Sequence, residues 1–164
     1  MSATSARIAW PLTLAIPGIA YMLLSLQAGF DLQRAGVAVD GARLALLLGK
    51  GALLGTAGIA LVAVLAYAVL RAAGSAVTAG AAIRAFGVAH AIPLLYAVCG
   101  MVLNLALGWN TALACGVTGL LWALGPLMAS LRELSGGKSW LAVTLSTLTG
   151  GLLLFAWASL GLGS

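Results

Sequence analysis

Side chains able to carry out acid–base, redox or metal chemistry are scarce in this 164-residue chain. It contains one histidine, three acidic residues and two cysteines. Haem ligation by two histidines is impossible within one such chain, and no His/Cys cluster has the spacing of a zinc site. No nucleophile, base and orienting group can be assembled into a catalytic set. The sequence therefore predicts a non-enzymatic protein without a metal or other cofactor.

A few polar residues nevertheless lie within or beside long apolar segments: Gln27, Asp31, His90, Asn104 and Asn110. Such residues are costly at membrane depth and often mark function. We take His90, Asn104 and Arg84 as candidates for polar functional contacts. His90 is either a proton or ligand contact or a hydrogen-bonded residue near the cytoplasmic interface, and Arg84 is expected to extend to the headgroups. His90 and Asn104 are 14 residues apart, near opposite ends of one predicted helix.

Five apolar segments fill almost the whole chain: 10–28, 44–70, 86–107, 111–131 and 140–160. Each can cross a hydrocarbon core about 30 Å thick as a helix. Apolar and polar residues do not alternate as they do in barrel strands. Charged residues are only 7% of the chain, against about 25% in soluble domains. We therefore predict an all-α fold, with residues 1–164 forming one polytopic transmembrane bundle of five helices.

The distribution of positive charge predicts the orientation of this bundle. One side would carry Arg7, Arg71, Arg84, Arg132 and Lys138, and the other side would carry Arg34, Arg43 and Lys50. The positive-inside rule then places the N-terminus in the cytoplasm and the C-terminus outside. The net charge of +5 is spread singly between the segments, so the expected partner is the lipid bilayer and not nucleic acid.

Small residues at regular spacing indicate where helices approach closely. Gly51 and Gly55 form one such pair, and a second stripe recurs every four residues in the fourth segment: Thr111, Cys115, Gly119 and Ala123. Chance is the alternative explanation, because the chain has 22 glycines. Leu120 is taken as the neighbouring position that faces lipid, and Cys99 and Cys115 as small interior residues.

Proline positions predict bends within three of the five segments. Pro17 lies in the first segment, Pro93 in the third and Pro126 near the end of the fourth. Each proline removes a backbone donor that would otherwise bond within the helix.

Two stretches resemble the Yip (Ypt-interacting protein) domain family. Residues 83–95 (IRAFGVAHAIPLL) are similar to the family's basic–aromatic–small entry into a proline-containing third span, and residues 131–142 (LRELSGGKSWLA) are similar to its turn after the fourth span. The resemblance rests on these stretches and on the five spans in a compact chain, and it implies an N-terminus in the cytoplasm and a C-terminus outside. Trafficking members carry an Asp-Leu-Tyr-Gly-Pro motif that this sequence lacks, so a Rab-GTPase partner is not expected.

Two functional hypotheses follow from these observations. The first is a membrane-organising or partner-binding module that binds another membrane protein or forms a homo-oligomer. The composition, rich in Ala, Gly and Leu, is typical of GC-rich bacteria and favours the bacterial cytoplasmic (inner) membrane. The alternative is a small transporter or lipid-handling channel, since discontinuous helices often flank substrate sites. A wide, wet cavity containing His90 or Asn104 would favour the alternative, and a dry bundle would disfavour it.

Overall fold

The computed structural model describes residues 10–162, and every element in that range is a helix. The elements are α1 (Trp10–Thr13), α2 (Ala15–Arg34), α3 (Gly41–Leu53), the π-helical turn η1 (Leu54–Gly58), α4 (Ile59–Ala72), α5 (Ala79–Ala89), α6 (Ala91–Leu107), α7 (Ala112–Leu134) and α8 (Ser139–Leu162). By length and composition, five continuous or nearly continuous stretches can cross a membrane: α2, α3–η1–α4, α5–α6, α7 and α8. The prediction of an all-helical chain with five such helices is confirmed.

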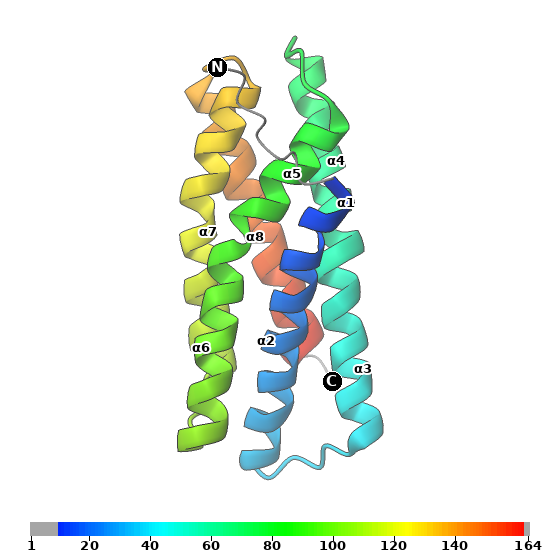
Figure 1. Ribbon diagram of the computed structural model, residues 1–164, viewed down its shortest axis with the longest axis vertical. Coiled ribbons are helices and arrows are strands. Elements are labelled where there is room, and N and C mark those ends of the chain that lie inside the picture. The colour runs from blue at the N-terminus through cyan, green and yellow to red at the C-terminus, as the bar shows by residue number, and fades with distance from the viewer. Residues whose placement is uncertain (1–9, 163–164) are drawn as a thin grey trace, which may run out of the picture.

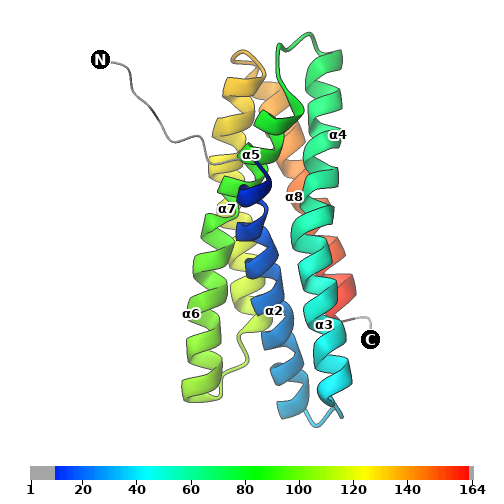
Figure 2. The same ribbon diagram turned by 45° about the vertical axis from the view of Figure 1, so that its right-hand side comes forward.

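The five long helices run alternately up and down in one bundle (Figures 1 and 2). The α2–α3 and α6–α7 connections lie at one end, which is the lower end in Figure 1, and we call it the α2–α3 end. The α4–α5 and α7–α8 connections lie at the opposite end, where Lys138 donates a hydrogen bond to the carbonyl of Ala73. Helix α2 is the most enclosed of the five and packs against α3, α6 and α7. It therefore sits where polar side chains can find partners on several helices.

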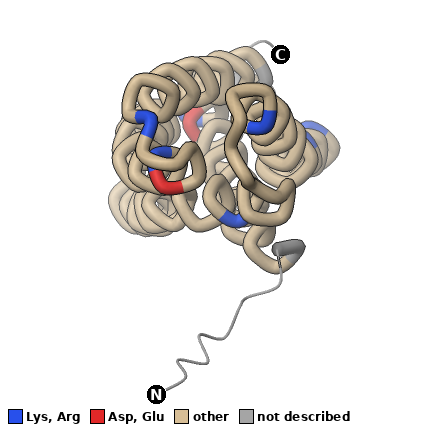
Figure 3. Tube along the Cα trace, turned by 90° about the horizontal axis from the view of Figure 1, so that it is seen from above, with Lys and Arg blue, Asp and Glu red and all other residues tan. Residues whose placement is uncertain are grey.

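Charged positions and large apolar side chains are arranged as a membrane-spanning bundle requires. Figure 3 shows charged positions at several places around the bundle, with basic and acidic positions lying close together on one side. Large apolar side chains face outward on every long helix, such as Leu61 of α4, Leu95 of α6 and Phe155 of α8. These outer faces suit contact with hydrocarbon, since lipid tails are as apolar as the side chains themselves.

Two proline positions coincide with breaks in the helices, and one does not. The break between α1 and α2 falls at Leu14, and the break between α5 and α6 falls at His90. In each case the proline that follows three residues later, Pro17 or Pro93, cannot donate to the carbonyl four residues before it. Pro126 lies inside α7, which continues without a break.

Two helices extend well beyond the boundaries expected from the apolar segments. Helix α2 starts at Ala15 and runs on to Arg34 instead of ending near residue 28, because its polar residues find bonding partners. Helix α5 starts at Ala79 rather than near residue 86. The side chain of Thr78 caps it by accepting a 3.2 Å hydrogen bond from the backbone N–H of Ala81.

The Gly51 and Gly55 pair lies where the second long helix crosses α2. A Cβ atom added to Gly51 would lie 2.5 Å from the carbonyl oxygen of Tyr21, and one added to Gly55 would lie 2.3 Å from that of Pro17. Both distances are too short for any side chain, so the two backbones are in direct contact. Gly55 also lies within η1, and the wider π-turn is placed at this crossing.

The stripe on the fourth long helix lies toward α6. Thr111, Gly119 and Ala123 are buried and Cys115 is half-buried. A Cβ atom added to Gly119 would lie 3.1 Å from the Cα atom of Pro93. Helices α6 and α7 therefore approach each other closely along this face.

Two expectations about individual residues of the third and fourth spans are wrong. Leu120 does not face lipid: it is only 5% exposed, because α7 packs against α8 as well as α6 and so buries two adjacent faces. The outward positions are Leu121 and Trp122. Cys99 is exposed on α6 and is not an interior residue.

Candidate functional site

A cluster of hydrogen-bonded polar residues joins three helices at the α2–α3 end of the bundle. We call it the polar network, and it comprises Gln27, Asp31, Arg34, Asn104, Asn110 and Thr111. The first three share one face of α2, because residues three and four apart in a helix lie above one another. Asn104 comes from the last turn of α6, and the other two come from the connection that leads into α7.

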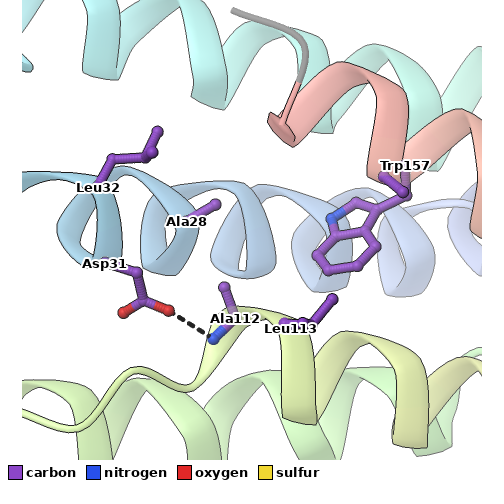
Figure 4. A pocket seen from close by; sticks show the side chains of 7 residues that line it. Ala28, Asp31, Leu32, Ala112, Leu113 and Trp157 are labelled. Atoms are coloured by element: carbon purple, nitrogen blue, oxygen red, sulfur yellow. Dashed lines mark hydrogen bonds between the residues drawn. The ribbon is translucent and has the colours of Figure 1, made fainter. Parts of the chain in front are cut away.

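Asp31 is the centre of this network. One carboxylate oxygen accepts hydrogen bonds from Asn104 Nδ2 at 2.6 Å and from Arg34 at 2.7 Å. The other accepts the backbone N–H of Ala112 at 2.9 Å, in the first turn of α7 (Figure 4). A carboxylate at this position satisfies a free N–H group and favours the positive end of the helix dipole. Asp31 therefore caps α7 from a different helix.

Gln27 and Thr111 extend the network into the bundle. The amide of Gln27 donates to the carbonyl of Ala97 at 2.7 Å, and the hydroxyl of Thr111 lies 3.0 Å from both Gln27 Oε1 and the carbonyl of Gly100. Because a hydroxyl has one proton, it donates to one of these oxygens at a time. It also accepts from Asn104 Nδ2 at 3.2 Å. A Cβ atom added to Gly100 would lie 2.5 Å from Gln27 Oε1, so a side chain here would displace Gln27 from its position in the network.

Arg34 closes the network at the end of the bundle. Its guanidinium donates to Asn110 Oδ1 at 3.1 Å and to the carbonyl of Trp109 at 3.0 Å, besides its ion pair with Asp31. Helix α6 ends next to it at Gly108, whose φ of +67° lies in the left-handed region that glycine adopts easily. Arg34 is exposed, so its bonds hold the connection in place more than they add stability.

A second polar pair lies nearer the other end of the bundle, at the break between α5 and α6. His90 is 2% exposed, and its Nδ1 lies 2.7 Å from the carbonyl of Phe86, so Nδ1 carries the proton and Nε2 is an acceptor. The rings of His90 and Tyr21 have centroids 5.9 Å apart. Within the described part of the chain, neither His90 Nε2 nor the Tyr21 hydroxyl has a hydrogen-bond partner.

The three residues singled out from the sequence do not form one site. Asn104 belongs to the polar network, whereas His90 lies against Tyr21 toward the opposite end of the same span. Arg84 is half-buried on α5. Both His90 and Asn104 are nearly fully buried, so each is enclosed by close packing and not by a wide, wet cavity.

A cavity of about 170 Å³ adjoins the polar network, between α2, α7 and the final turns of α8. Its lining residues are Ala28, Asp31, Leu32, Ala112, Leu113, Trp157 and Ala158 (Figure 4). Trp157 is only 4% exposed, and no described residue accepts a hydrogen bond from its indole Nε1. The cavity thus combines apolar walls with one unused donor.

The histidine, cysteine and acidic side chains are dispersed in the described structure. No group of three or more His, Cys, Asp and Glu side chains between Trp10 and Leu162 is placed to hold a metal ion. Cys99 and Cys115 are both free thiols.

Sequence reasoning identified most members of the network one by one but missed their assembly. The order of the spans could have predicted this assembly. In an up-and-down bundle, the last residues of the first span and the connection between the third and fourth spans lie on the same side of the membrane. No comparable signal in the sequence was available for the bridging role of Thr111, the close contact between Gly100 and Gln27, or the unused donor of Trp157.

Comparison with protein-family models, curated proteins and solved structures finds no significant match to this chain. These comparisons therefore give no support to the similarity to the Yip domain family, which rests on the two sequence stretches and the five predicted spans.

Proposed function

We propose that this chain is a non-enzymatic integral membrane protein that acts as a membrane-organising or partner-binding module. The observation that carries the proposal is the polar network. In transporters, polar side chains at membrane depth line the path of a solute or proton. Here Gln27, Asp31, Asn104 and Thr111 bond to one another and to backbone groups across three helices. Most of their bonding capacity is used to fix the shape of the bundle, and only the side-chain oxygen of Asn104 lacks a partner among the described residues.

A bundle fixed in this way offers its outer surface for recognition. The outward faces carry large apolar side chains on several helices, among them Leu61, Leu95, Trp122 and Phe155. A second membrane protein, or a second copy of this chain, can pack on such a face through shape complementarity. The two stretches similar to Yip proteins favour the same class of multi-pass protein. We place it in a bacterial cytoplasmic membrane on the basis of composition, with the N-terminus inside on the basis of loop charge.

Site-specific photocrosslinking in native membranes tests this proposal. A photoreactive amino acid is placed in turn at Leu61, Leu95, Trp122 and Phe155, so that four helices are sampled. The buried position Leu131, 0% exposed, serves as the matched control. We expect a discrete protein adduct from at least one outward face and none from Leu131. Adducts with lipid alone from all four faces would refute partner binding.

A small transporter or lipid-handling channel is the second candidate, and the cavity beside Asp31 is the observation that favours it. Solute or lipid flux in proteoliposomes is the discriminating measurement. Flux that is lost in both Asp31→Asn and Trp157→Phe but kept in Asp40→Asn would favour this candidate over the first. Asp40 is the appropriate control because it lies outside the cavity, where it caps α3.

A further inference from the structure

The cavity beside Asp31 has the features of a binding site for one bilayer lipid. We propose that an acyl chain of an ester-linked glycerolipid occupies it, and that the ester carbonyl of this lipid accepts a hydrogen bond from Trp157 Nε1. The lipid would be a resident ligand wedged between α2, α7 and α8. This inference is independent of partner binding, because a module and a transporter could both hold such a lipid.

The indole of Trp157 is held so that its donor faces the cavity. The far edge of its six-membered ring packs on Gly116, where an added Cβ atom would lie 2.5 Å from the ring. Figure 4 shows the indole nitrogen pointing toward Ala28 and Ala112. A buried indole N–H usually finds a hydrogen-bond partner, and no described residue supplies one. Nε1 is itself fully buried, so an acceptor that enters the cavity reaches it after a small shift of the residues around the indole.

The residues that line the cavity indicate the size and polarity of the rest of the ligand. Apart from Trp157 and Asp31, every lining residue is alanine or leucine. The volume of about 170 Å³ is several times the 30 Å³ or so that one water molecule occupies in the liquid. Leu113 lines the cavity and is 59% exposed, so the hollow reaches the outer surface of the bundle. Several methylene groups with one acceptor atom match this shape.

The negative charge of Asp31 favours an ester as the acceptor group of the ligand. Both oxygens of Asp31 already accept hydrogen bonds from Arg34, Asn104 and Ala112, so the carboxylate does not require a cationic ligand. A free fatty acid would bring a second carboxylate beside it. The cavity lies at the end of the bundle that holds the α2–α3 and α6–α7 connections. There the ester groups of a bilayer mark the boundary of the hydrocarbon core, the depth that tryptophan prefers.

Exchange of ester-linked for ether-linked lipid tests the hydrogen bond without altering the protein. The purified ¹⁵N-labelled protein is placed in nanodiscs of diacyl phosphatidylcholine or of dialkyl phosphatidylcholine with chains of equal length. The ether lipid lacks only the carbonyl oxygens. Trp157→Phe identifies the Trp157 indole resonance, and Trp122, exposed on the outside of α7, is the internal control.

We expect the indole proton of Trp157 to move upfield in the ether lipid while that of Trp122 stays in place. Identical Trp157 resonances in the two lipids would overturn the assignment of the ester carbonyl as acceptor.

Occupancy is tested separately with a phosphatidylcholine that carries a photoreactive group in one acyl chain. Ala158→Leu fills the cavity, and Ala114→Leu adds the same bulk to an exposed position of α7. We expect labelling around residues 112–113 and 157–158 in the wild-type protein and in Ala114→Leu, and its loss in Ala158→Leu. Trp157→Phe should bind the lipid about fivefold more weakly, as for one net hydrogen bond. Undiminished labelling of Ala158→Leu, or stronger labelling by a photoreactive free fatty acid than by the ester, would overturn the proposal.

Discussion

Replacement of Asp31 by Asn gives the sharpest test of the polar network. An Asn side chain has one acceptor oxygen and one donor NH₂ group, whereas both Asp31 oxygens face donors. If the NH₂ group takes the place of one oxygen, it meets the N–H of Ala112. If it takes the place of the other, it meets Asn104 and Arg34. Either orientation therefore sets donor against donor.

The magnitude follows from the bonds that Asp31→Asn removes. A hydrogen bond to a charged group contributes about 1.5–3 kcal/mol, and a charge at a helix N-terminus contributes about 0.3–1 kcal/mol. The exposed ion pair with Arg34 adds little. We therefore expect Asp31→Asn to lower the free energy of unfolding by about 2–4 kcal/mol.

Asp40→Asn is the matched control for this substitution. Asp40 caps α3 by accepting a 2.8 Å hydrogen bond from the N–H of Arg43 in the same segment. Asn is as good an N-cap as Asp, so the loss should stay below about 0.5 kcal/mol. Both variants are unfolded by SDS titration in one mixed micelle and followed by circular dichroism. Equal losses for the two variants would refute the interhelical role of Asp31.

Three further predictions concern helix packing and orientation. Gly119→Leu should lower the free energy of unfolding by about 1–3 kcal/mol through overpacking against α6. Leu121→Ala, on the exposed face of α7, should have a smaller effect in the same titration. Equal effects of the two substitutions would contradict the α6–α7 contact. Gly55→Ala should destabilise because its methyl group would lie 2.3 Å from a backbone carbonyl of α2. Gly49→Ala meets nothing within 4 Å and should be neutral or stabilising by up to about 1 kcal/mol; a neutral Gly55→Ala would contradict the close crossing. A C-terminal alkaline phosphatase fusion should be active and a C-terminal fluorescent protein that cannot fold outside should be dark, and the reverse result would overturn the predicted orientation.

The spans were predictable because the hydrophobicity of a helix in lipid is a local property. Uninterrupted apolar runs and loop positions gave five helices, and Pro17 and Pro93 indicated breaks close to where they occur. The end of α2 was misplaced because Asp31 and Arg34, besides pairing with each other, bond to partners more than 70 positions away along the chain. A local pattern contains no information about such distant partners.

The error at Leu120 has a similar physical origin. Helical spacing gives the face on which small residues gather, but not how many neighbours a helix has. Helix α7 has α6 on one side and α8 on another, so burial extends around to Leu120. The cavity beside Trp157 likewise depends on where the final turns of α8 meet α2 and α7, and spacing along one helix does not determine that meeting point.

The central position of α2 has a consequence for biogenesis. Helix α2 precedes the other four long helices in the chain, yet Gln27 and Asp31 bond to groups that lie 70 to 84 positions later. At translation rates of about 5–20 residues per second, these partners emerge roughly 4–17 s after it. During that interval, the amide of Gln27 is unpaired and the Asp31 carboxylate has only Arg34 of its own helix as a partner, so α2 must remain in or beside the insertion machinery. Its hydropathy is also the lowest of the five. We therefore expect release of α2 into lipid to be delayed until α6 and α7 arrive, so that an insertase or chaperone shelters it meanwhile.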